Sequence, residues 1–167
     1  MPKRTRRILV ITLLGILLLR WIFLLVMQFA TSPVATGVVG GHLGPASAAP
    51  NGVCSLDRPI EKYRYVPVHV NLDRTWGILV DYLKHRPRVR LELQQQDYLH
   101  ATFRTPLLGF IDDVEFYLDR DQGRIEYRSA SRIGYHDMGT NAARIKAVIG
   151  EVFRRDQGGQ APDSHRD

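Results

Sequence analysis

The feature that most constrains the fold is an alternation of apolar and polar residues between positions 89 and 128. Val114, Phe116 and Leu118, for example, take every second position and are separated by polar or aromatic residues. Because successive side chains of a strand point to opposite faces, this pattern predicts strands with one buried face and one polar face. The expected strands are 89–94, 98–104, 113–118 and 125–128.

The last two of these strands form a hairpin whose register follows from the same pattern. Pairing Leu118 with Ile125 keeps the apolar residues on one face and leaves 120–123 as a four-residue loop. The same register places Glu115 directly opposite Arg128 on the other face. A shift by one residue would mix the two faces, so this pairing is the one we expect.

Two amphipathic helices flank the four strands. The first begins near Leu72, where apolar residues recur at helical spacing, and Asn71 or Asp73 is its expected cap. The second runs from about Asp137 to Arg155. The predicted fold class is therefore α+β: a two-layer sandwich of helix, four-stranded antiparallel meander and helix, preceded by an N-terminal transmembrane helix.

The transmembrane helix is predicted from the apolar run 8–30, which follows a basic head and is interrupted by Arg20. A bilayer core requires about 20 helical residues, so this run is long enough to span it. Alternatively, the span is 21–39, with Arg20 at its cytoplasmic edge. Basic residues remain in the cytoplasm, which predicts a single-pass protein of the inner (plasma) membrane with an extracytoplasmic, periplasmic C-terminal domain.

The remaining boundaries follow from composition. Residues 31–54 are rich in Gly, Ala, Ser and Pro and are expected to form a flexible linker. The domain is then 55–156, and the polar segment 157–167 is expected to be a disordered tail. An A-x-A cleavage pattern at 46–48 lies far behind the apolar run, which favours an uncleaved anchor over a cleaved signal peptide.

The net charge of +6 does not indicate a nucleic-acid-binding protein. Five basic residues precede position 21 without an acidic one, whereas 55–156 contains 17 Lys and Arg against 15 Asp and Glu. The excess charge thus belongs to the membrane-targeting segment, and no nucleic acid is expected as a partner. Cys54 is the only cysteine, so it cannot form a disulfide within the chain.

Residues 128–135 read R-S-A-S-R-I-G-Y, and 109–116 read G-F-I-D-D-V-E-F. With these runs the chain, over about 50–153, resembles the family catalogued as domain of unknown function 1499. The resemblance implies exported or membrane-associated bacterial and plastid proteins, and it brings no established activity. The chain departs from the family in having Gly52 where a cysteine is usual, so no role of that cysteine is carried over.

The polar residues of these runs form a candidate ligand or anion site. Adjacent carboxylates near arginines can act as an acid/base or ion-binding site, because their pKa values are then shifted. Alternatively, Glu115 and Arg128 form a cross-strand pair that fixes the register. Arg128 and Arg132, near the start of the second helix, form an anion pocket or pair with nearby carboxylates. The candidate residues are Asp112, Asp113, Glu115, Arg128, Ser129, Ser131, Arg132, Tyr135 and His100.

Other kinds of site lack their sequence patterns. His100 and His136 do not occur at a metal-ligand spacing, so no metal and no cofactor are expected. Ser129 and Ser131 do not lie in a G-x-S-x-G turn, which argues against a serine hydrolase.

The leading hypothesis is a membrane-anchored, extracytoplasmic accessory or small-ligand or anion-binding module of the cell envelope, without catalysis of its own. A small hydrolase or transferase that uses Asp112, Asp113, His100 and Arg132 is the first alternative. A structural envelope module that binds a protein partner through the sheet edge is the second. The expected partners are the membrane, through 8–30, an anionic small molecule or lipid headgroup, and an envelope protein.

Overall fold

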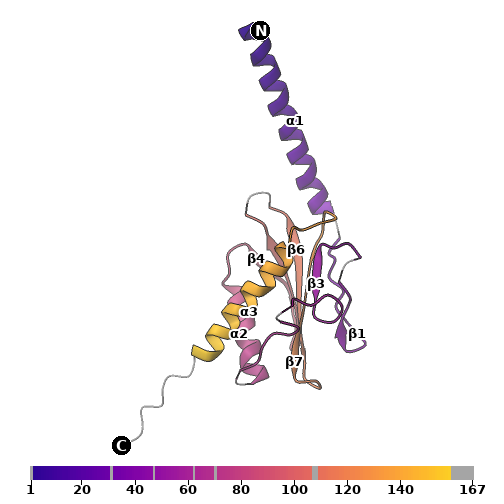
Figure 1. Cartoon of the computed structure of the whole chain (residues 1–167), viewed down its shortest axis with the longest axis vertical. Coiled ribbons are helices and arrows are strands. Elements are labelled where there is room, and N and C mark those ends of the chain that lie inside the picture. The colour runs from indigo at the N-terminus through magenta and orange to yellow at the C-terminus, as the bar shows by residue number, and fades with distance from the viewer. Residues whose placement is uncertain are drawn as a thin grey trace, which may run out of the picture. The chain divides into compact units, whose positions relative to one another are not determined.

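The computed structural model describes residues 2–30, 32–46, 48–61, 63–69, 71–106 and 109–158. The chain divides into two compact units (Figure 1). The first ends at Ser32 and contains helix α1 (Lys3–Ala30), and the second begins at Pro33 and contains every other described helix and strand.

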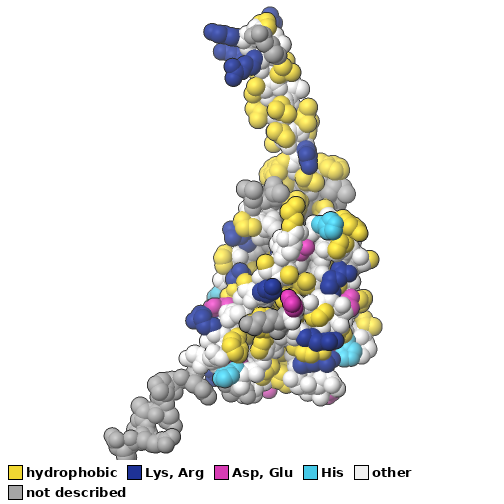
Figure 2. Space-filling view, in the orientation of Figure 1, with side chains coloured by type: hydrophobic (Ala, Val, Ile, Leu, Met, Phe, Trp, Pro, Cys, Tyr) yellow, Lys and Arg dark blue, Asp and Glu magenta, His cyan; other side chains and the backbone are white. Residues whose placement is uncertain are grey.

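Helix α1 has the length and composition of a membrane-spanning segment. It contains 28 residues, and at about 1.5 Å per residue it is longer than the roughly 30 Å hydrocarbon core of a bilayer. Its segment Lys3–Val26 is apolar enough to span a membrane, and hydrophobic side chains cover it beyond a basic start (Figure 2). The alternative span 21–39 is wrong, because residues 32–37 are not helical and Val38–Val39 form strand β1.

The second unit is built on an antiparallel sheet in the order β3-β7-β6-β5-β4. The hairpin register predicted from the sequence is confirmed: Leu118 pairs with Ile125, and Glu115 pairs with Arg128. Residues 120–123 form the connecting loop. The four predicted strands are β4 (Val89–Gln94), β5 (Tyr98–Arg104), β6 (Ile111–Asp119) and β7 (Arg124–Ser131).

The segment expected to be a flexible linker, 31–54, differs from that expectation. Its end forms β3 (Gly52–Cys54), which adds a fifth strand beside β7. Its middle forms a small hairpin of β1 (Val38–Val39) and β2 (His42–Leu43). These strands are too short to show an alternation of apolar and polar residues. Their contacts are made mainly by backbone groups, which a Gly-rich composition does not reveal.

Helices α2 (Leu72–Lys84) and α3 (Thr140–Gly158) lie side by side on one face of the sheet (Figure 1). Asn71 caps α2 as predicted, because its side-chain oxygen accepts the Arg74 backbone N–H at 2.8 Å. Helix α3 starts three residues later than predicted, and the Asp137 carboxylate accepts the Asn141 N–H at 2.8 Å. Both helices turn their apolar faces to the sheet, which confirms the α+β class.

The core lies between the helices and the sheet. Burial of these apolar side chains is the main favourable contribution to folding, at roughly 25 cal/mol per Å² removed from water. A buried carboxylate, Asp156, joins the two helices at its edge by accepting the Thr75 hydroxyl at 2.7 Å and the Arg74 Nε–H at 3.0 Å. The fully buried apolar residues of the core include Leu79, Leu83, Leu99, Phe116, Ile125, Tyr127, Ile145 and Ile149.

Some sequence-based expectations concern residues outside the described part of the chain. The predicted disordered tail, 157–167, is described only at 157 and 158, which belong to α3. Ser47, in the middle of the A-x-A pattern, also lies outside the described residues.

Tyr127 provides a test of how the segment before α2 is attached to the sheet. Its hydroxyl is buried, accepts the Ile60 N–H at 2.8 Å and donates to the Tyr63 carbonyl at 2.6 Å. Tyr127→Phe takes this acceptor from a buried N–H, so we expect a loss of about 1–3 kcal/mol in the free energy of unfolding. Urea denaturation of the full chain in detergent measures it. Tyr135→Phe, at a 69% exposed position, is the matched control, and an equal loss there would contradict the prediction.

Candidate functional site

The strand alternation divides the predicted site between two faces of the sheet. Asp113 and Glu115 extend from β6 to the face opposite the helices, which we call the outer face. Asp112 has the parity of the core residue Val114, so it points to the helix side, where it pairs with Arg144 of α3. Two carboxylates that are neighbours in the sequence therefore belong to different clusters.

On the outer face, Glu115 and Arg128 form the cross-strand pair that the sequence predicted as the alternative to an acid/base or ion-binding site. Arg128 Nη1 donates to Glu115 Oε2 at 2.8 Å, and the Tyr98 hydroxyl donates to Oε1 at 2.8 Å. Both members of the pair are buried, with Glu115 fully inaccessible. Burial, followed by the negative charge of Glu115, raises the pKa of Tyr98 above its ordinary value, so this hydroxyl remains a donor.

Asp113, beside this pair, has three side-chain donors. His100 Nε2 lies 2.7 Å from Oδ1, and Arg132 donates from Nε and Nη2, both at 2.9 Å. Burial alone would raise the pKa of the Asp113 carboxyl. The hydrogen bonds from His100 and Arg132 outweigh burial and hold that pKa well below its usual range, so Asp113 is a permanent anion at neutral pH.

The remaining donors to these carboxylates are backbone N–H groups of residues 33–46, which we call the strap. Val34 donates to Asp113 at 3.0 Å, and Gly37 donates to Glu115 at 2.7 Å. Further along, Leu43 donates to the buried Glu126 at 2.9 Å. The outer face of the sheet is thus occupied by the chain itself.

The helix-side cluster lies at the end of β6 and β7 where α3 begins. The Ser129 hydroxyl donates to Asn141 Oδ1 at 2.5 Å, and Asn141 Nδ2 donates to Ser131 Oγ at 3.0 Å. Arg144 pairs with Asp112 and also donates to Ser129 at 3.3 Å. Both serines thus take part in a hydrogen-bond network that joins β7 to the start of α3. Among the described residues, neither serine has a general base beside it.

Tyr135 joins neither cluster. Its side chain is 69% exposed and makes an edge-on contact with the His136 ring, at 4.7 Å between centroids. The predicted nine-residue set therefore separates into an outer-face group of five, a helix-side group of three, and Tyr135. The outer-face residues are His100, Asp113, Glu115, Arg128 and Arg132, and the helix-side residues are Asp112, Ser129 and Ser131.

One group of side chains in the described part of the chain has ligand atoms close enough for a metal ion: His42, Asp119 and Glu126, with those atoms within 4.8 Å of one another. The Arg124 guanidinium already lies among them, 3.0 Å from Glu126 and 3.2 Å from Asp119. A cation in the same place would be repelled by this arginine.

The sequence did not predict a hollow that lies between the ends of β4 and β5 and the first two turns of α3. Its volume is about 320 Å³, and none of the described residues that line it is acidic. The Arg104 N–H donates a hydrogen bond to the Arg88 carbonyl oxygen at 2.9 Å, which places the backbones of these two arginines opposite each other. We call this hollow the arginine pocket; it is lined by Arg86, Pro87, Arg88, Phe103, Arg104, Thr105, Pro106, Thr140, Ala143, Arg144 and Ala147.

The arginines of the pocket differ in their environments. The Arg144 side chain is 8% exposed, lies over the Phe103 ring at 5.1 Å and is neutralised by Asp112. Arg86 lies over the Tyr82 ring at 5.2 Å. Arg88 is exposed, and no hydrogen bond or ion pair joins its guanidinium to another residue in the described ranges. The basic run R-P-R-V-R at 86–90 is the sequence feature that could have indicated this pocket, but only the fold brings the run close to α3.

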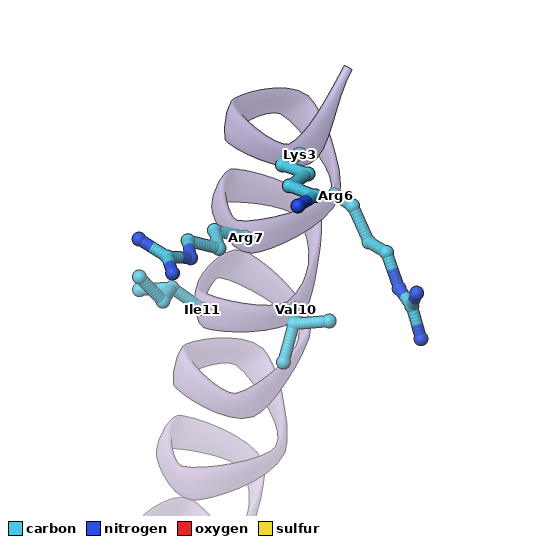
Figure 3. Close-up of a pocket in the computed structure, with 5 residues that line it drawn as sticks. All are labelled: Lys3, Arg6, Arg7, Val10 and Ile11. Carbon is cyan, nitrogen blue, oxygen red and sulfur yellow. The ribbon is translucent and has the colours of Figure 1, made fainter. Parts of the chain in front are cut away.

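A second hollow is associated with α1 alone (Figure 3). The side chains of Lys3, Arg6 and Arg7 extend outward from the helix, with Val10 and Ile11 one turn further on. Such a surface, with basic residues followed by apolar ones, suits the boundary between headgroups and hydrocarbon better than a small molecule.

Most of the folded unit matches a known sequence family. Residues 42–152 match the family model described as a protein of unknown function, DUF1499. The chain belongs to this family. The DUF1499 match begins at the second strand of the strap hairpin and ends within α3, so it includes both polar clusters and the arginine pocket. No curated protein matches the chain.

The Asp113 contacts predict a pH-dependent stability. Asp113→Asn leaves Arg132, 11% exposed, without its anion, so we expect a loss of about 3–5 kcal/mol at neutral pH. Because the folded-state pKa is depressed, this contribution is complete above the unfolded value of about 4 and is lost as pH falls through the lower folded value. Melting curves of the full chain in detergent should therefore converge for the two proteins in acid.

Asp121→Asn provides the matched control, since Asp121 is exposed in the hairpin loop. A difference between wild type and Asp113→Asn that stayed constant down to the lowest pH would contradict the role given to the Asp113 charge.

Proposed function

We propose that this protein is a membrane-anchored, extracytoplasmic module of the cell envelope that binds a small anion in the arginine pocket and has no catalysis of its own. The observation that carries the proposal is the charge of the pocket. Four arginines line it, and none of its described lining residues is acidic; Arg144 pairs with Asp112, which lies outside the lining.

The exposed guanidinium of Arg88 supports an anionic ligand. An anion near this positive charge is attracted to it. Arginine is also suited to the task, because its planar guanidinium donates two parallel hydrogen bonds to a phosphate or a carboxylate. Thr105 and Thr140 add hydroxyl groups to the lining.

The walls of the pocket indicate what else the ligand carries. Phe103 is buried, and with Pro87, Pro106 and two alanines of α3 it makes up the apolar part of the lining. A volume of about 320 Å³ is at the small end of ligand sites in proteins. A phosphate or carboxylate attached to a short apolar or polyol group is the chemical class that fits.

The hydrolase alternative receives less support from the geometry. It requires Asp112, Asp113, His100 and Arg132 to act together, but Asp112 is on the helix side of the sheet and the other three are on the outer face. His100 and Asp113 are 8% and 0% exposed, so a substrate would have to displace the strap to reach them.

Binding of a protein partner through the sheet edge is also less favoured. The open edge is β4, which is interrupted by an irregularity between Leu91 and Leu93 and carries Arg90 and Glu92, 3.4 Å apart, on its surface. Irregularities and charges of this kind discourage the addition of a further strand.

The extracytoplasmic location is supported by the basic start of α1, which favours a cytoplasmic N-terminus. The strap supports retention of the anchor. Cleavage after Ala48 would cut the chain between the strap and β3, although both belong to the folded unit.

We expect a cysteine introduced as Asp121→Cys to react with a membrane-impermeant maleimide in intact spheroplasts. Cys54 is buried, and burial raises its thiol pKa, so the unmodified chain is the background control. The labelled band should have the mass of the uncleaved chain. Labelling only after lysis would reverse the proposed topology, and a band shorter by the first 48 residues would contradict a retained anchor.

Anion binding is tested by thermal shift and calorimetry on the full chain in detergent, with inorganic phosphate, pyrophosphate and citrate as probes. We expect Arg88→Gln to weaken binding about 10- to 100-fold, which corresponds to about 1.5–3 kcal/mol for hydrogen bonds to a charged group. Arg154→Gln, on an exposed arginine paired with Glu151, is the matched control and should bind as wild type. Equal weakening in both variants would indicate only a general charge effect, against a pocket.

A further inference from the structure

The loop that joins β7 to α3, residues 132–139, exposes two large apolar side chains beside the arginine pocket. Met138 is 100% exposed and Tyr135 is 69% exposed. Helix α3 begins directly after the loop at Thr140, and Thr140 lines the pocket, so the apolar loop leads into the basic pocket.

The loop has a defined backbone. Gly134 and Gly139 adopt positive φ angles of 99° and 78°, which glycine tolerates, and Met138 has a φ of 52°. The Asp137 carboxylate accepts the N–H groups of Gly139 and Asn141, so its charge is engaged at the start of α3. Burial would raise the pKa of Asp137, but these hydrogen bonds lower it, which keeps the cap in place at neutral pH.

We propose that this end of the domain docks on an anionic lipid bilayer, with a lipid phosphate in the arginine pocket and the Tyr135 and Met138 side chains in the headgroup region. The proposal rests on the anion-binding function proposed above and names the source of the anion. Protein surfaces that bind a membrane interface generally combine basic groups, which bind lipid phosphates, with apolar and aromatic side chains.

Charge and covalent linkage favour a bilayer over a free anion. None of the described residues that line the pocket is acidic, so the pocket complements a negatively charged surface as well as a single phosphate. Helix α1 ends at Ala30 and the folded unit begins at Pro33, in place of the linker of residues 31–54 expected from the sequence. Because α1 would hold the domain at the membrane, docking does not require the domain to find the bilayer from solution, so even a weak interaction suffices.

The test places a fluorescent probe at the loop. The full chain carrying Met138→Cys is labelled with an environment-sensitive nitrobenzoxadiazole and reconstituted in nanodiscs of phosphatidylcholine alone or mixed with phosphatidylglycerol. Met138 makes no buried contact, and Cys54 is fully buried, so labelling is selective and the fold is retained. We expect a blue shift and a severalfold gain in emission in the anionic discs only.

Matched variants connect the signal to the pocket. In the labelled chain, Arg88→Gln with Arg104→Gln should abolish the blue shift, whereas Arg90→Gln with Arg154→Gln, which removes the same charge outside the pocket, should preserve it. Loss of the signal in both pairs would overturn the proposal, because it would show attraction by net charge alone. An equal blue shift in neutral discs would also overturn it, since no headgroup would then be recognised.

The phosphate titration separates this proposal from the one on which it rests. If phosphate binds in an Arg88-dependent way while the probe never shifts, the pocket takes a soluble anion and membrane docking is excluded. If neither phosphate nor anionic discs give a response, both proposals fail.

Discussion

The folded unit depends on carboxylates that are buried on the outer face of the sheet. Asp113, Glu115 and Glu126 are all fully inaccessible to solvent, and an ionised group without donors at such a position would cost far more than the stability of a domain. Each therefore has a cation and at least one backbone N–H of the strap as partners. The strap is held by charge-assisted hydrogen bonds, and the sheet in turn requires the strap to satisfy its acids.

This requirement explains why several charged residues of the sheet are buried rather than exposed. Arg128 and Arg132 complete pairs inside the domain, and Arg128 also donates to the strap carbonyl of Pro45 at 2.8 Å. Two exposed arginines, Arg88 and Arg104, line the hollow on the helix side. The internal network thus satisfies the buried carboxylates, and the basic pocket is the surface for which we propose a binding role.

Part of this organisation could be predicted from the sequence. The register of Leu118 with Ile125 and the cap at Asn71 were correct, because strand alternation and helix capping are local patterns. The same alternation already implied that Asp112 and Asp113 point to opposite faces, so grouping them in one catalytic cluster conflicted with it. The role of the strap was not predictable from composition, since its contacts use backbone N–H groups that any residue provides.

The sequence by itself determined an apolar N-terminal helix of membrane-spanning length, an antiparallel meander with two amphipathic helices, and membership of the DUF1499 family. Only the tertiary structure decided that residues 33–46 cover the polar face, that Asp113 faces Arg132 while Asp112 faces Arg144, and that Arg88 and Arg104 meet near α3. Local patterns depend on neighbours within a few residues. The pairing of buried charges depends on segments almost 80 positions apart, such as Val34 and Asp113, which come together only when the sheet is formed.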